Sequence, residues 1–305
     1  MTRILASLLI SLAVGFGQPK VSDVESSYNK LKEAEARKDA DGILEWAQKT
    51  SAAARLVTSQ PKPAGGDELE AWKRDTDYAS QVDTYTEYSL QAAVATGLAS
   101  DAKAIAFTEA LDAQNPKSQY LPLIYPQYMQ ALQRAGQGAK LMAFAEKRLP
   151  ADPANEGLLF VLADGYRNQK DPAKSTEYAN KLVDTMKSKE KPATMSDAAW
   201  EERKKTLLAQ GYWIAGINYG SQNQHKDADR TLRGALPLIQ GQNELLGPAL
   251  FYLGVANYSM AKPAKDKKLA AEAVKFSDQC ALIKGPFQDQ AKKNALSIRR
   301  EFLIR

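Results

Sequence analysis

Stretches of helix-forming residues, each ended by glycine or proline, constrain the fold of this chain more than any other feature. Between these breaks the sequence is rich in Ala, Leu, Glu, Lys and Gln and has few runs of β-branched residues, a composition that favours helices over strands. The longest stretch runs from Asp67 to Gly97. Within it Tyr78, Val82 and Tyr85 recur at steps of three or four residues and so share one helix face. The sequence therefore predicts an all-α protein.

Proline and glycine also divide the chain into segments. Residues 61–66, Pro-Lys-Pro-Ala-Gly-Gly, are the one stretch with the composition of a linker. Helical pairs become shorter and more regular after Asp152-Pro153, and Gly285-Pro286 precedes a last helical segment. The predicted segments are a leader at 1–17, an N-terminal helical hairpin at 18–60, the linker at 61–66, irregular helical hairpins at 67–149, repeats at 150–283 and a C-terminal capping helix at 284–305.

The first seventeen residues have the pattern of a secretory signal peptide. Arg3 is their one charged residue, an apolar or small run extends from Ile4 to Gly17, and polar sequence begins at Gln18. The run is shorter than the about 20 apolar residues of a membrane-spanning helix, although a retained anchor is the alternative. Gly15 and Gly17 are small enough for a cleavage site, so we expect a mature chain that begins at Gln18.

Cys280 is the only cysteine of the chain, and this bears on both location and stability. No cysteine lies near the leader, so there is no lipobox, and a single cysteine cannot close a disulfide within the chain. We expect Cys280 to be packed between helices, with pairing to a partner as the alternative. The expected location is periplasmic or secreted, without stable membrane insertion after signal cleavage.

The charge balance argues against a nucleic-acid ligand. The chain has 41 basic and 36 acidic residues, and removal of the leader deletes only Arg3, which leaves 40 against 36 and a net charge of +4. The basic residues are scattered, and the short runs at Arg203 to Lys205 and at Lys265 to Lys268 are typical of solvated helix faces. A nucleic-acid binder would gather them on one stripe. We therefore expect no nucleic-acid partner.

Histidine and cysteine, on which many catalytic and metal sites depend, occur only once each. His225 is the only histidine and falls in a predicted turn, so with Cys280 it cannot form a thiolate or histidine metal site. No Gly-x-Ser-x-Gly motif is present, and the residues from Gly136 to Lys140 lack the spacing of a phosphate-binding loop. Chemistry by carboxylates alone stays possible in principle, but the acids are spread along helix faces. We expect no enzymatic activity, metal or cofactor.

One segment resembles the tetratricopeptide repeat. Tyr212, Gly216 and Tyr219 on a first helix, followed by Ala228 and Leu232 on a second, fall in the register of that family without a gap. Gly216 and Ala228 would allow the two helices to approach closely, and the larger residues would fill the space between neighbouring hairpins. The resemblance covers residues 150–283 best and implies an α-solenoid, in which antiparallel helix hairpins stack into a right-handed superhelix. With the leader, it suggests an exported bacterial-type protein of the tetratricopeptide family.

Two further segments match this pattern in part. The run from Asp152-Pro153 to Tyr166 has the family's spacing from proline to tyrosine. The other segment contains Leu250, Leu253 and Gly254, but Asn257 replaces the expected tyrosine, and the residues from Lys262 to Lys268 lengthen the predicted turn. The repeat array is therefore degenerate.

The resemblance also implies which residues bind a partner, because this family binds ligands on the concave face formed by the first helices. The aromatic residues at its fifth position would form an apolar column in the groove, or would turn into the core where helix lengths are irregular. The family's Lys and Asn carboxylate clamp is not matched. The predicted protein- or peptide-binding residues are Phe160, Asp164, Arg167, Asn168, Trp213, Ile217, Phe251, Val255 and Tyr258.

The expected function is that of an exported helical-repeat scaffold or adaptor that binds a protein or peptide in its concave groove. The alternative is a soluble extracytoplasmic protein that binds a solute or carbohydrate, with Trp213 as a stacking platform. The sequence does not identify the partner.

Overall fold

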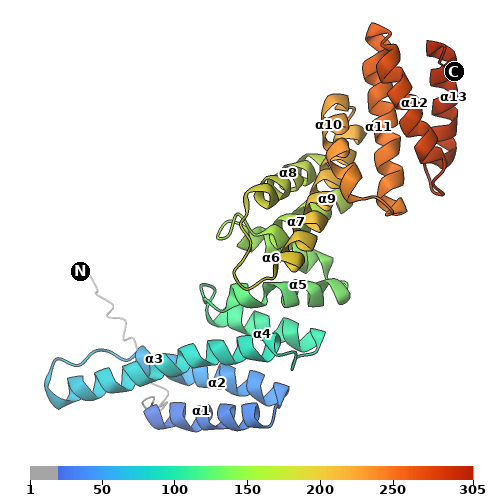
Figure 1. The fold of residues 1–305 in the computed structure, drawn as a ribbon. Helices are drawn as coiled ribbons and strands as arrows, with labels where there is room; N and C mark the ends of the chain where they lie inside the picture. Colours follow the sequence, from blue (N-terminus) through green and yellow to red (C-terminus); the bar gives the residue numbers. More distant parts are fainter. Residues whose placement is uncertain (1–19, 305) are drawn as a thin grey trace, which may run out of the picture. The chain divides into compact units, whose positions relative to one another are not determined.

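The structure is a computed structural model that describes residues 20–304. Within this range the chain forms thirteen α-helices and two short 3-10 helices, and no strand (Figure 1). The predicted all-α fold class is confirmed. None of the helices in residues 20–304 is both long enough and apolar enough to cross a membrane. The predicted signal peptide, residues 1–17, lies outside the described residues.

The chain divides into two compact units between Gly136 and Gln137. In the first unit α1 and α2 form a hairpin, the long helix α3 pairs with α4, and α4 packs against α5. Its elements are α1 (Val21–Ala36), α2 (Ala40–Thr58), α3 (Gly66–Ala95), α4 (Asp101–Gln114), the 3-10 helix η1 (Leu121–Ile124) and α5 (Tyr125–Arg134).

The second unit is a succession of paired helices. Its elements are α6 (Gly138–Arg148), α7 (Glu156–Asn168), α8 (Pro172–Ser188), α9 (Asp197–Ser221), α10 (His225–Ala235), the 3-10 helix η2 (Leu236–Leu238), α11 (Asn243–Ala264), α12 (Lys267–Ala281) and α13 (Gln288–Phe302). Helices α7 and α8, α9 and α10, and α11 and α12 pair as hairpins, and α13 packs against α12. The unit begins at Gln137, and its first helix, α6, packs against α7. The predicted segment boundary at residue 149 stays a prediction.

Local sequence explains where the helices begin. The Asp171 side chain accepts a hydrogen bond from the backbone N–H of Lys174 at 3.0 Å, and Pro172 occupies the first position of α8. This arrangement satisfies an N–H that has no partner within the helix. Asp39 caps α2 in the same way, through the N–H of Gly42 at 3.0 Å.

Small residues bring the paired helices together. A Cβ atom on Gly216 would lie 2.5 Å from Cδ2 of Leu232, so only glycine permits the observed approach of α9 to α10. Ala228 on the same side of α10 is fully buried. The predicted close approach at these two residues is confirmed. Cys280 is likewise 1% exposed, as expected for a residue packed between helices.

One predicted local feature is wrong. Helix α11 continues to Ala264, so most of the predicted long turn at Lys262 to Lys268 is helical, and only the turn at Lys265-Asp266 remains. Arg203 is exposed on α9, as expected for a solvated helix face, and it also donates to the carboxylate of Glu156 at 2.9 Å. That carboxylate also binds Lys189, so one acidic side chain of α7 contacts both the end of α8 and the second turn of α9.

Candidate functional site

The predicted groove residues lie on the first helices of three consecutive hairpins in the second unit. Helix α7 carries four of them, α9 carries two and α11 carries three. Asn168 is exposed and the other eight are half-buried. These eight are neither fully in the core nor freely exposed, because each helix packs against the first helix of the neighbouring hairpin.

The three aromatic residues of the predicted column do not stack on one another. The indole N–H of Trp213 donates to the backbone oxygen of Leu245 at 2.8 Å, which fixes the ring against the start of α11. Phe160 packs against the same buried cluster as Trp213, while Phe251 lies 4.6 Å from Phe287, centroid to centroid, at the start of α13. These rings fill the joints between hairpins and expose only part of their surface.

Four of the predicted residues do form one cluster. Arg167 pairs with Asp164 at 2.7 Å, and Asn168 donates to the same carboxylate at 3.1 Å. The guanidinium of Arg167 also lies 5.7 Å from the centroid of the Trp213 ring. A cluster of Asp164, Arg167, Asn168 and Trp213, the arginine cluster, thus joins α7 to α9. Its arginine and aspartate are about one-third exposed.

Two other predicted residues have their main contacts elsewhere in the second unit. The Tyr258 hydroxyl donates to Glu301 of α13 at 2.7 Å, and its ring lies 6.4 Å from that of Phe302. Ile217 packs against the core formed by α9, α10 and α11. Tyr258 is thus tied to the last helix rather than presented with Trp213.

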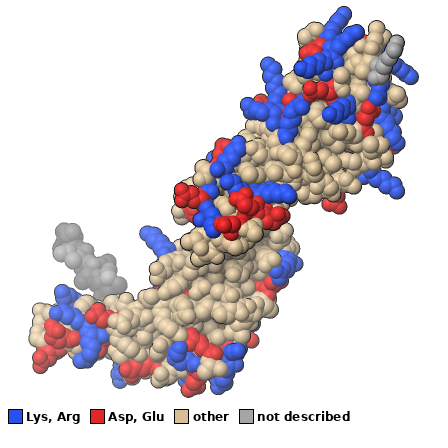
Figure 2. Space-filling view, viewed as in Figure 1, with Lys and Arg blue, Asp and Glu red and all other residues tan. Residues whose placement is uncertain are grey.

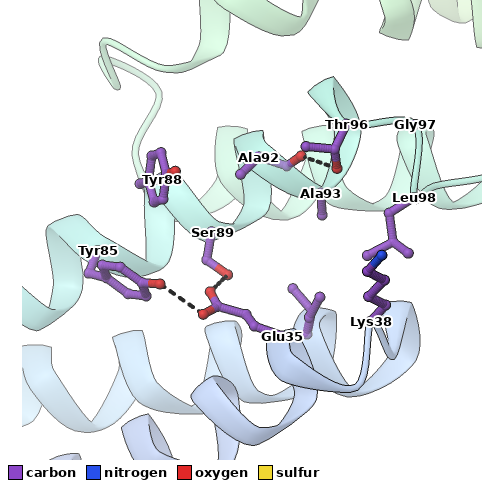
Figure 3. A pocket seen from close by; sticks show the side chains of 11 residues that line it. Glu35, Lys38, Tyr85, Tyr88, Ser89, Ala92, Ala93, Thr96, Gly97 and Leu98 are labelled. Atoms are coloured by element: carbon purple, nitrogen blue, oxygen red, sulfur yellow. Dashed lines mark hydrogen bonds between the residues drawn. The ribbon is translucent and has the colours of Figure 1, made fainter.

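A second candidate site, which the sequence analysis missed, lies in the first unit. It is a cavity of about 500 Å³ between the end of α1, the start of α2 and the C-terminal half of α3 (Figure 3). Small side chains on α3 leave the space, since Ser89, Ala92 and Ala93 stand where larger residues would fill it. The lining residues are Glu35, Lys38, Ile43, Tyr85, Tyr88, Ser89, Ala92, Ala93, Thr96, Gly97 and Leu98.

A polar network fixes one wall of this cavity. The Glu35 carboxylate accepts hydrogen bonds from the Tyr85 hydroxyl at 2.8 Å and the Ser89 hydroxyl at 2.7 Å (Figure 3). Lys32 donates to the same carboxylate at 2.7 Å and to the oxygen of Tyr85 at 2.6 Å. The network ties α1 to α3 and holds the Tyr85 ring in one orientation.

The network also sets the charge of these groups. Burial disfavours the ionised carboxylate of Glu35, but the hydrogen bonds from Lys32, Ser89 and Tyr85 outweigh burial and lower its pKa. The hydrogen bonds of Lys32 to Glu35 and Tyr85 raise the pKa of the ammonium. Glu35 and Lys32 therefore form a compensated ion pair at neutral pH. The ammonium of Lys38, at the other end of the cavity, has no ion-pair partner among the described residues.

Tyr85 also belongs to a row of four tyrosines, the tyrosine row. Tyr28 on α1 meets Tyr85 edge to face at 5.4 Å, and Tyr85 lies 5.8 Å from Tyr88, centroid to centroid. Tyr120, just before η1, meets Tyr88 at 6.0 Å. Tyr88 is 45% exposed, and the other three are half-buried.

The sequence carries a signal for this surface. Tyr85 and Tyr88 are followed by a stretch without any charged residue, from Ser89 to Ser100. Figure 2 likewise shows few charged side chains over the C-terminal half of α3 and over α4 on the face in view. The packing of Tyr28 and Tyr120 beside them involves residues distant in sequence, which a helix periodicity does not reveal.

Comparison with protein-family models gives no match, and no curated protein matches the chain. Within residues 20–304 there is also no group of three or more His, Cys, Asp or Glu side chains arranged to hold a metal ion. Among residues 20–304, the arginine cluster and the tyrosine row each gather partly exposed side chains suited to recognition.

Proposed function

We propose that this protein is an exported helical-repeat scaffold of tetratricopeptide type that binds a protein or peptide and performs no catalysis. In this proposal the hairpins form a right-handed α-solenoid, and the partner lies along their first helices. The proposal is supported by the contacts in the second unit, where α7 packs against α9, α9 against α11, and α11 against α13. Such contacts between alternate helices are what a stack of repeats requires.

The arginine cluster is the observation that carries the proposal. It joins the first helices of two consecutive hairpins, and it presents a partly exposed arginine over the ring of a tryptophan. Arginine and tryptophan are the residues most enriched among those that dominate the binding energy of protein interfaces. Because Asp164 already orients the guanidinium, a partner would meet a preformed surface at little entropic cost.

The test is a capture experiment with the chain from Gln18 onwards as bait and extracytoplasmic extract as the source of partners. We expect Arg167→Ala to lose a protein that the unmodified chain retains. Arg230→Ala is the matched control, because Arg230 also pairs with an aspartate three residues earlier, Asp227, but lies on a second helix, α10. Equal capture by both variants and the unmodified chain would count against the proposal.

The cavity in the first unit favours a second candidate function, the binding of a small solute or carbohydrate. Its volume suits a small ligand, and Tyr85 and Tyr88 supply rings on which a sugar could stack. A ligand that binds only the folded protein raises its melting temperature. A rise with a sugar or other solute that Tyr88→Ala abolishes would support this function, and no rise across a broad solute panel would exclude it in favour of the scaffold.

Export is tested separately from binding. If residues 1–17 act as a cleaved signal peptide, protein recovered from the extracytoplasmic fraction will begin at Gln18 when its N-terminus is sequenced. Recovery of the intact leader in the membrane fraction would instead indicate the retained anchor.

A further inference from the structure

The cavity of the first unit has a different chemical character at each end. The rings of Tyr85 and Tyr88 line one end (Figure 3). At the other end the side chain of Lys38 extends from the end of α1 toward Leu98. A ligand that uses the whole cavity would therefore meet aromatic rings at one end and an ammonium group at the other.

The middle of the cavity is apolar. Ile43, Ala92 and Ala93 line it, and the two alanines leave the room in which a ligand would lie. The stretch of α3 from Tyr85 to Ala93 spans about 12 Å along the helix axis. A volume of about 500 Å³ is within the range of sites that bind small molecules. The walls thus favour an elongated ligand with an apolar body.

Most polar groups of the lining are already engaged by the protein. The hydroxyls of Tyr85 and Ser89 donate to Glu35, and the hydroxyl of Thr96 donates to the backbone oxygen of Ala92 at 2.7 Å. A sugar needs many hydrogen-bond partners because each of its hydroxyls loses water on binding. This lining offers few donors to such a ligand, which favours one with a single polar group.

The charge of that group follows from Lys38. Among residues 20–304 its ammonium forms no ion pair, whereas Glu35 is neutralised by Lys32. The two aspartates that follow Lys38 in the chain are engaged elsewhere, since Asp39 caps α2 and Asp41 pairs with Lys103. One positive charge at the cavity is therefore uncompensated, and it would attract an anionic group.

We propose that the cavity of the first unit binds a small amphipathic carboxylate, with the carboxylate at Lys38 and an apolar chain along α3 that ends in a ring near Tyr88. A carboxylate carries a single negative charge, which matches a single ammonium. This inference rests on the second candidate function and deepens it, because it names the class of solute. It makes no use of the arginine cluster.

The experiment measures binding of phenylbutyrate and of its uncharged amide to the chain from Gln18 onwards by isothermal titration calorimetry. The two compounds share the ring and the chain and differ in charge. Lys38→Met removes the ammonium and keeps most of the side chain, whereas Lys38→Arg keeps the charge. Ala92→Leu fills the cavity.

Lys170→Met is the matched control variant. Lys170 follows α7 as Lys38 follows α1, both lysines are exposed, and both have a positive φ, 60° and 53°. Lys170 does not line this cavity. Any effect of the substitution on the turn after a helix is therefore common to the two variants.

We expect phenylbutyrate to bind about three- to tenfold more tightly than the amide, which is the range for one ion pair at a partly exposed site. Lys38→Met should weaken phenylbutyrate by the same factor and leave the amide unchanged. Lys38→Arg and Lys170→Met should keep the binding of the unmodified chain, and Ala92→Leu should abolish the binding of both compounds.

Four results would overturn the inference: no binding of phenylbutyrate, equal affinity for the acid and the amide, no effect of Lys38→Met, or full binding by Ala92→Leu. If acid and amide bind equally and Ala92→Leu removes both, the cavity binds solutes and only the assigned class is wrong. Partner capture that depends on Arg167 would support the scaffold whichever of these results is found.

Discussion

One buried residue explains how the repeat that departs from the family pattern still packs. Asn257, where the tetratricopeptide pattern expects tyrosine, is fully buried. Its amide donates to Asp229 at 2.6 Å and to the backbone oxygen of Leu253 at 2.9 Å, and Arg233 donates to its side-chain oxygen at 3.3 Å. A polar network between α10 and α11 thus takes the place of a ring that would have filled the joint.

Removal of this amide should destabilise the fold. Asn257→Ala leaves Asp229 and Arg233 with a lost partner beside a small void, so we expect a loss of about 1–3 kcal/mol in the free energy of unfolding. Urea denaturation measures it. Asn294→Ala, at the half-exposed Asn294 of α13, is the control and should change the stability by less than about 0.5 kcal/mol. Equal effects of the two substitutions would show that the buried network contributes little.

A second prediction concerns Gly216, where α9 crosses α10. The added methyl of Gly216→Ala would meet Leu232 at 2.5 Å and a backbone nitrogen at 3.3 Å. We expect a loss of about 1–3 kcal/mol from overpacking. Gly138→Ala, in the first turn of α6, meets nothing within 4 Å and should be neutral or slightly stabilising. The melting temperatures of the two variants, each compared with that of the unmodified chain, test this difference.

At the scale of elements, one ion-paired carboxylate determines how α8 leads into α9. Glu156 begins α7 and is 9% exposed, and it binds Lys189 at the end of α8 and Arg203 within α9. Burial raises the pKa of this carboxyl, but the hydrogen bonds from Lys189, its own backbone and Arg203 outweigh burial and lower it below the ordinary value of 4.5. This group holds Lys189, the first residue of the eight-residue connection 189–196, and the second turn of α9 to the start of α7.

The lowered pKa predicts how stability depends on pH. A carboxyl whose pKa is lower in the folded state contributes stability that is present above its unfolded pKa of about 4.5 and is lost as pH falls through the folded value. We expect Glu156→Gln to destabilise the protein by about 1–3 kcal/mol at pH 7. The difference from the unmodified chain should shrink below about pH 4. Urea midpoints at several pH values test this, and a difference that does not change with pH would contradict it.

At the scale of the whole molecule, the division at Gly136 separates two cores. Each unit has its own buried clusters, and each contains two of the four tryptophans, Trp46 and Trp72 in the first and Trp200 and Trp213 in the second. Chains built of separate compact units depart from all-or-none unfolding. The tryptophans therefore offer a separate fluorescent report on each unit.

We expect the fluorescence-detected unfolding midpoints of the two units to respond differently to a substitution in the second unit. In a chain with Trp46→Phe and Trp72→Phe, fluorescence follows only the second unit, and adding Gly216→Ala should lower its unfolding midpoint. In a chain with Trp200→Phe and Trp213→Phe, Gly216→Ala should have little effect on the midpoint. Coincident shifts in both backgrounds would show that the units unfold as one.

The candidate sites were predictable to different degrees. The motif register led to Arg167 and Trp213, whose guanidinium and ring do meet. The register did not predict this contact, since the two residues hold different positions in their repeats. The predicted column of Phe160, Trp213 and Phe251 is not a stack, since Trp213 is bonded to Leu245 and Phe251 contacts Phe287. Tetratricopeptide character and export stay predictions.

By itself the sequence determined the all-α class, the long helix after Asp67 and the close approach at Gly216, because helix propensity and small-residue contacts act over a few neighbouring residues. Only the tertiary structure decided where the units divide, how Glu156 spans a connection, and that Tyr28 and Tyr120 join Tyr85 and Tyr88 in one row. The reason is physical. These contacts join residues about 30 or more apart, and which of them meet depends on how whole helices pack against one another.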